Sequence, residues 1–117
     1  MSVYPMEKHY TYYLDLLGEV DIPLDGILSR TLYNDDHIKI VLFGFDAGQT
    51  LSEHAASMPA VLHFLCGDAR LILGEDTLEA KTGTWAYLPA NTAHSVQART
   101  PVVLLMQVIK DWDSETE

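Results

Sequence analysis

From residue 26 onward, the sequence is a succession of short runs rich in β-branched and aromatic residues, separated by turn-forming residues. Runs of four to nine residues at this spacing are typical of an all-β sandwich or barrel, because each run is long enough for one strand and too short for a helix. The expected strands span residues 27–33, 37–45, 61–65, 70–73, 77–80, 84–88, 94–98 and 102–109.

Two turn clusters predict hairpins within this series. Asn34-Asp35-Asp36 separates the first two runs, and Gly74-Glu75-Asp76 separates the fourth from the fifth. Asn, Asp and Gly favour such turns because Asx side chains bond to nearby backbone amides and glycine tolerates positive φ.

The chain of 117 residues is long enough for one hydrophobic core and too short for two. We expect an N-terminal segment over residues 1–25, a barrel over 26–110 and an acidic tail over 111–117. In the first segment, tyrosines and leucines between residues 10 and 17 fit a short helix and an edge strand equally well, so both alternatives stay open.

The formal net charge of −10 argues against binding to nucleic acid or to an anionic membrane surface. The first residues lack the apolar stretch of a secretory signal, and the longest apolar run, 102–106, is far too short to span a bilayer. Cys66 is the only cysteine, which excludes an intrachain disulfide and a thiolate zinc cluster and gives no reason to call it a nucleophile. A reducing cytoplasm is the expected location.

Two stretches share spacings with a known pair of motifs. Gly48, His54 and Gly67 mark the first stretch, and Gly83, Pro89 and His94 mark the second. Together they resemble the two motifs of the cupin superfamily, which cover residues 48–98 here. The resemblance implies a double-stranded β-helix, the jelly-roll-like cupin barrel, with one divalent metal such as Fe, Mn, Ni or Zn inside it.

The resemblance also implies an incomplete metal site. His54 and His94 match two of the family's ligands, whereas Ala56 stands in place of the second histidine and Ala60 in place of the glutamate. A methyl group has no lone pair, so a metal held by the two histidines would depend on water or other side chains and would bind weakly. Asn91 replaces a motif glycine, which is understandable because Asn tolerates positive φ better than other non-glycine residues.

The candidate lining of an interior pocket consists of Ala56, Ala60, Met58, Tyr87 and Met106, although ordinary core packing is an alternative role for the larger three. His63 lies an odd number of residues from Ala60, so on a regular strand it points to the opposite face, and we expect it between sheets or at a subunit contact.

Three functions remain open from the sequence. The first is a barrel with an interior pocket that binds a small molecule through His54 and His94. A weakly held divalent metal at the same two histidines is an option within this hypothesis. The second is a metal-dependent enzyme of dioxygenase or isomerase type, and the third is a non-catalytic barrel with a vestigial site. The fold alone does not choose among them, nor does it say whether the protein is an enzyme.

The apolar residues on both faces of strands such as 38–45 predict a homodimer. One face of such a strand fills the barrel, and a chain of this size has little other material to cover the second face.

Overall fold

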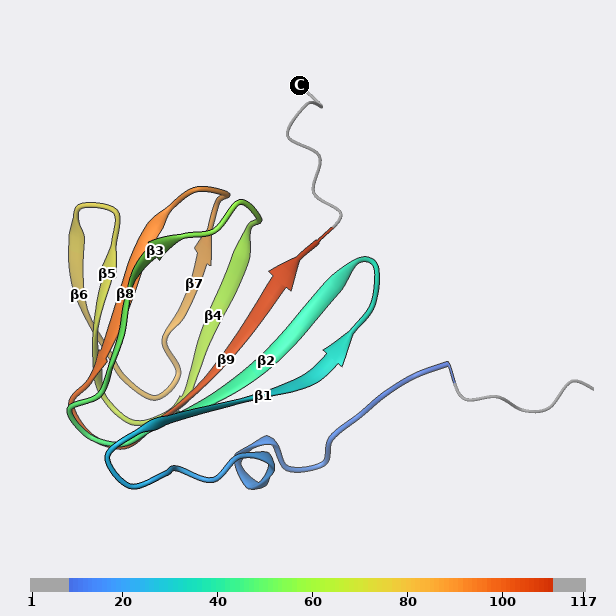
Figure 1. The fold of residues 1–117 in the computed structure, drawn as a ribbon, viewed down its shortest axis with the longest axis horizontal. Coiled ribbons are helices and arrows are strands. Elements are labelled where there is room, and N and C mark those ends of the chain that lie inside the picture. Colours follow the sequence, from blue (N-terminus) through green and yellow to red (C-terminus); the bar gives the residue numbers. More distant parts are fainter. Residues whose placement is uncertain (1–8, 111–117) are drawn as a thin grey trace, which may run out of the picture.

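The computed structural model describes residues 9–110, with the backbone but not the side chains at positions 53–55. The described residues form two antiparallel sheets that lie face to face (Figure 1). The five-stranded sheet has the order β1-β2-β9-β4-β7, and the four-stranded sheet has the order β3-β8-β5-β6. The strands are β1 (Ile27–Asn34), β2 (Ile38–Phe45), β3 (Thr50–Ala55), β4 (Ala60–Cys66), β5 (Ala69–Leu73), β6 (Asp76–Ala80), β7 (Trp85–Leu88), β8 (Ala93–Ala98) and β9 (Val102–Ile109).

This arrangement confirms the predicted all-β barrel and both predicted hairpins. It adds one strand, β3, that the residue pattern did not predict. The β3 sequence TLSEHA contains few β-branched or aromatic residues, so its local preference for a strand is weak. Its pairing with β8 supplies the strand geometry instead.

The hydrophobic core lies between the two sheets. On β4 every second residue is buried, namely Ala60, Leu62 and Phe64, and on β8 the buried residues are His94, Val96 and Ala98. Side chains alternate between the faces of a strand, so these residues share the inner surface of the barrel. Most of the buried core consists of aliphatic and phenylalanine side chains from both sheets.

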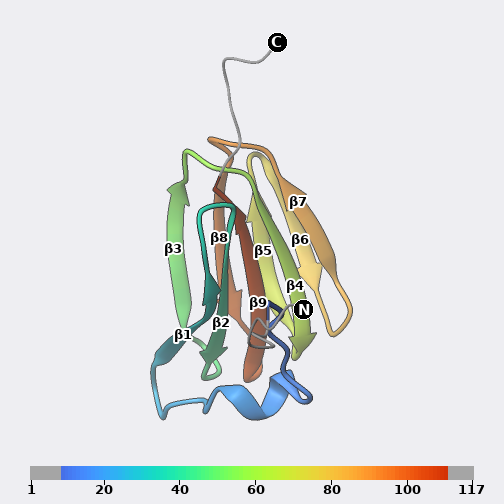
Figure 2. The ribbon, with the colours of Figure 1, turned by 90° about the vertical axis from the view of Figure 1, so that its right-hand side faces the viewer.

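The N-terminal segment covers part of the outer face of the five-stranded sheet (Figure 2). It holds a single turn of 3-10 helix, Leu16–Glu19, and is otherwise without regular structure from residue 9 to β1. Val20 packs with Leu32, Leu42 and Leu105, and the Tyr13 hydroxyl donates to the Leu32 carbonyl oxygen at 2.7 Å. The short-helix alternative is therefore closer to the structure than the edge strand.

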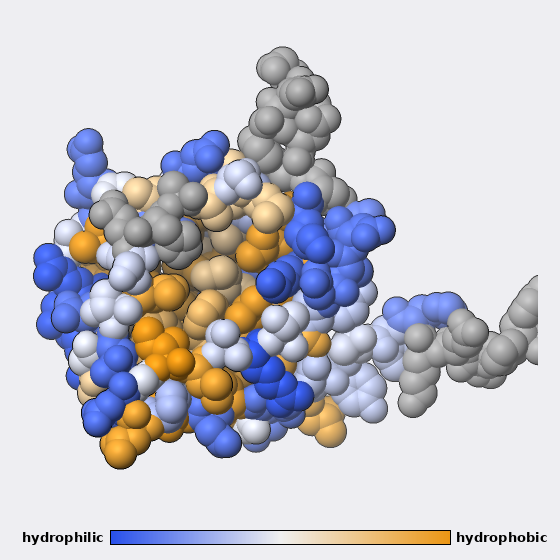
Figure 3. Space-filling view, in the orientation of Figure 1, coloured by the Kyte–Doolittle hydropathy of each residue, from blue (hydrophilic) through white to orange (hydrophobic). Residues whose placement is uncertain are grey.

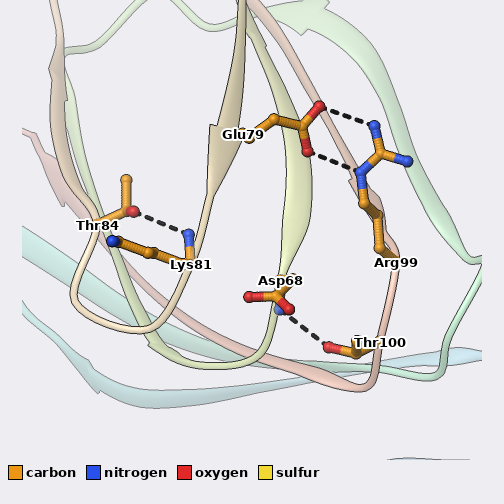
Figure 4. A network of polar contacts seen from close by, with 6 residues as sticks. All are labelled: Asp68, Glu79, Lys81, Thr84, Arg99 and Thr100. Atoms are coloured by element: carbon orange, nitrogen blue, oxygen red, sulfur yellow. Dashed lines mark hydrogen bonds and ion pairs between the residues drawn. The ribbon is translucent and has the colours of Figure 1, made fainter.

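The two ends of the barrel differ. We call the end that carries the β3–β4 and β7–β8 loops the mouth, and the opposite end, with the turns after β4, β6 and β8, the base (Figure 1). Polar contacts join the elements at the base (Figure 4). Asp68 N donates to Thr100 Oγ1 of the β8–β9 turn at 2.9 Å, and Arg99 of the same turn pairs with Glu79 of β6 at 2.8 Å. Hydrogen bonding to the Arg99 guanidinium lowers the pKa of Glu79 below its ordinary value.

Gly67 is required at the base. It has a φ of 99°, and a Cβ added there would overlap the Pro101 carbonyl oxygen and lie 2.9 Å from the Val102 Cα atom. The close approach of two backbone segments therefore explains the glycine that closes the first motif.

In the part of the chain that the structure describes, no helix has the length and apolar character needed to cross a membrane. The acidic tail, 111–117, and residues 1–8 lie outside the described residues.

Candidate functional site

The two motif histidines lie at facing positions of one strand pair. In the antiparallel pairing of β3 with β8, His54 is the direct partner of His94, and Ala55 is the partner of Ala93. The register shifts by a bulge between Leu51 and His54, which separates this pair from the regular ladder below it. Whether both imidazoles enter one cavity stays a prediction, because the side chain of His54 lies outside the described part.

His94 is a buried polar group in an apolar surrounding. Its side chain is 3% exposed, on the same inner face as Val96 and opposite Leu73 of β5. The ring nitrogen Nδ1 lies 3.0 Å from the Thr92 carbonyl oxygen. Because a carbonyl oxygen only accepts, Nδ1 carries the hydrogen, and in the neutral ring the lone pair is on the buried Nε2. The backbone thus fixes both the tautomer and the ring orientation.

The β7–β8 loop positions this histidine. Asn91 has a φ of 67°, as its replacement of a motif glycine predicts. The backbone N–H of Asn91 donates to the Ala56 carbonyl oxygen at 2.7 Å. The Thr92 hydroxyl donates to the Pro89 carbonyl oxygen at 2.8 Å. The first bond holds the β7–β8 loop against the β3–β4 loop at the mouth, beside the strand pair that carries His54 and His94. The second bond lies within the β7–β8 loop.

The described residues do not fit the family's metal site. Ala60 is buried on the inner face of β4, between Leu88 and Val108 of the neighbouring strands, and Ala56 lies half-buried in the β3–β4 loop. Neither offers a lone pair at the positions of the missing glutamate and histidine. Among the residues whose side chains are described, no group of three or more His, Cys, Asp or Glu could hold a metal ion.

The remaining predicted lining residues separate into two groups. Met106 packs partly buried against the inner core, and Met58 is half-buried in the β3–β4 loop at the mouth. Tyr87, in contrast, alternates with the inward Ala86 and Leu88 and is 48% exposed on the outer face. Strand alternation therefore removes Tyr87 from the inner lining.

His63 lies on the outer face of β4, as its phase relative to Ala60 predicts. Its strand partners there are Trp85 and Leu105.

One inward residue was missed by the sequence reasoning. Lys39 shares the phase of Val41, Phe43 and Phe45 on β2, and the last two pack against the inner core. It is half-buried and paired with Val108 at the mouth. The signal was present in the alternation of β2, but a lysine beside a turn is usually read as a surface residue.

The inner surface is not completely filled. Leu73 and Met106 toward the mouth, and Phe43, Leu51 and Ala86 farther toward the base, pack against the core but stay partly exposed. Hydrophobic residues are visible in a hollow between the two sheets in Figure 3. Ser29 and Thr31 of the edge strand β1 are exposed although they share the inner phase, so water reaches this side of the barrel.

A second hollow lies on the outer face. A groove of about 440 Å³ runs between residues 11–16 and strands β1, β2 and β9. At the rim of this groove the Tyr33 hydroxyl donates a hydrogen bond to the Asp35 carboxylate at 2.7 Å. This bond, together with two bonds from backbone amides, lowers the pKa of Asp35 to about 2. Both Asp35 and the amides belong to the β1–β2 turn, so this shift has a structural cause.

Several proteins of known structure share this fold. A conserved protein of unknown function from Streptococcus pyogenes is 30% identical over 97% of this chain and 98% of its own length, with a TM-score of 0.79. A cupin superfamily protein from Desulfitobacterium hafniense is 20% identical, with 87% and 94% of the two chains covered and a TM-score of 0.80. An RmlC-like cupin protein from Desulfovibrio desulfuricans is 24% identical over 86% and 98%, with a TM-score of 0.77.

No family model matches the sequence, and no curated protein matches it either. The two antiparallel sheets, the register of the motifs and the structural neighbours define a cupin jelly-roll barrel. The chain therefore shares the fold of the cupin proteins of known structure.

Proposed function

We propose that this protein binds a small, largely apolar molecule inside the barrel, with His94 as its polar anchor and His54 as a second contact. The observation that carries the proposal is the buried His94 imidazole, 3% exposed and held in one tautomer by Thr92. An inward histidine whose ring is oriented by the backbone, beside partly exposed apolar side chains, suits a ligand site.

The hydrogen bond from Nδ1 to Thr92 restricts which ligand groups His94 can bind. With the hydrogen on Nδ1, the Nε2 atom accepts, so a ligand hydroxyl is a suitable partner. The partly exposed side chains on the inner surface are aliphatic, aromatic or thioether groups, which favour an apolar body. Facing positions of an antiparallel pair share one face of the sheet, which supports a second contact from position 54.

The alternatives have less support. A metal-dependent enzyme of dioxygenase or isomerase type would need ligands that Ala56 and Ala60 do not supply. A barrel with a vestigial site gives no reason for the bonds that orient the His94 ring.

Phenol tests the proposal because it combines an apolar ring with one hydroxyl. We expect phenol to shift the NMR signals of the Met106 and Leu73 methyl groups, and His94→Leu to weaken binding about fivefold to tenfold, the usual value of one hydrogen bond. His63→Leu, on the outer face, is the matched control and should leave binding unchanged. Shifts confined to Leu16 and Ile40 of the outer groove would contradict the proposal.

A further inference from the structure

Lys39 occupies an unusual place for a lysine. Across the inner face of the five-stranded sheet, its strand neighbours are Asn34 on β1 and Val108 on β9, and Val108 is in turn followed by Ala60. These neighbours connect Lys39, through Val108, with Ala60, whose methyl group stands where the cupin motif has a glutamate. Lys39 is half-buried here, so its aliphatic stem packs along the inner face while its ammonium group stays within reach of water.

No hydrogen bond or ion pair joins Lys39 Nζ to any side chain that the structure describes, although the chain has 17 acidic residues. The nearby polar groups are engaged elsewhere. Asn34 Oδ1 accepts from Lys110 Nζ at 2.9 Å, and the Asp35 carboxylate accepts from Tyr33 and two backbone amides. Lys39 and Lys110 therefore bring two positive charges to the same rim of the mouth.

We propose that Lys39 recognises the anionic group of the ligand, and that the ligand class is a small organic carboxylate with an apolar body. This inference rests on the proposed function, because it concerns the same interior site. The ligand body lies against Met106 and its strand partner Val41, and the ligand carboxylate pairs with Lys39.

Electrostatics supports a role for Lys39 in binding an anion. The net charge of −10 repels anions over most of the surface, so an anionic ligand needs a local cation for capture. An ammonium beside apolar walls interacts more strongly with a carboxylate than an exposed one does, because the local dielectric is lower. The missing glutamate acts in the same direction, since Ala60, two strands from Lys39 on the same face, adds no negative charge to repel a ligand carboxylate.

Benzoate and benzamide test the inference because they share a ring and differ in charge. Titrations of the full chain, followed at the Met106 methyl signal, should show benzoate binding at least about threefold more tightly than benzamide. Lys39→Met should remove this preference without weakening benzamide, and Lys39→Arg should retain it. Lys81→Met, an exposed lysine at the base, is the matched control. Added KCl should reduce the preference, as charge screening requires.

The outcomes separate the two proposals. If phenol and benzamide bind at Met106 but benzoate binds no more tightly, the role of Lys39 is overturned and the interior site stands. An unchanged benzoate preference in Lys39→Met also overturns it. If none of the three probes shifts Met106, both proposals fail.

Discussion

At the scale of single residues, the mouth is defined by what has replaced the family's ligands. Ala60 keeps the inner position but contributes a methyl group, while His94 keeps both its position and its oriented ring. Sequence spacing alone predicted these positions, together with the positive φ of Asn91. It missed Lys39, because only the strand phase distinguishes an inward lysine from a surface one.

The first prediction concerns the empty ligand positions. Ala60→Glu alone should destabilise the fold by about 2–4 kcal/mol, because the new carboxylate is buried between Leu88 and Val108. Ala56→His with Ala60→Glu should bind Zn²⁺ more tightly than wild type and regain stability with the metal. Chemical denaturation and calorimetry at pH 7.5 measure both effects. Equal Zn²⁺ affinity in wild type and double mutant would contradict this interpretation.

Gly67 gives a second prediction. Gly67→Ala should lower the free energy of unfolding by about 2–4 kcal/mol, since both the φ of 99° and the overlap with Pro101 oppose a side chain. Gly74→Ala is the control: its φ is also positive, but an added Cβ meets nothing within 4 Å, so about 1–2 kcal/mol is expected. Equal losses in urea denaturation would show that the backbone contact at the base is unimportant.

The third prediction concerns pH. The pKa of Asp35 is about 2, below its ordinary value of 3.8, chiefly because the Tyr33 hydroxyl donates to it. A lowered folded-state pKa stabilises the fold above the unfolded value, and this contribution is lost as pH falls from 3.8 to 2. Tyr33→Phe should raise the pKa of Asp35 toward its ordinary value and so narrow the pH range over which this stability is lost. An NMR titration of the Asp35 carboxyl group measures the change. An unchanged pKa would assign the shift to the backbone amides.

At the scale of elements, strand alternation accounts for most of the correct expectations. It placed His63 on the outer face of β4, while the two turn clusters predicted the hairpins. It failed where local preference is weak or tertiary contacts decide. β3 becomes a strand through its pairing with β8, and Leu16–Glu19 forms one helical turn where the segment packs on the outer sheet.

At the scale of the whole molecule, the outer face of the five-stranded sheet is the surface where we expect a subunit contact. The N-terminal segment covers only part of this face, and Trp85 and Tyr87 stay 60% and 48% exposed. The outward residues of β4 and β7 include no Asp, Glu, Lys or Arg, in a chain in which these residues make up 21%. An uncharged face allows two copies of an acidic chain to meet without repulsion.

We therefore expect a homodimer through this face. Analytical ultracentrifugation at micromolar concentration should give twice the chain mass of 13.1 kDa. Trp85→Glu should shift the equilibrium to monomer, because it places a charge at the apolar contact. Thr77→Glu, exposed on the other sheet, should leave the dimer intact. A wild-type monomer would show that the N-terminal segment suffices to cover the sheet.

The central claim is that the barrel interior, anchored by His94, holds the ligand. A crystal structure of the protein soaked with phenol tests it most directly. We expect the phenol ring between the two sheets near the mouth, with its hydroxyl within hydrogen-bond distance of His94 Nε2. Phenol bound only in the outer groove, or an interior filled by side chains with no phenol in it, would contradict the claim.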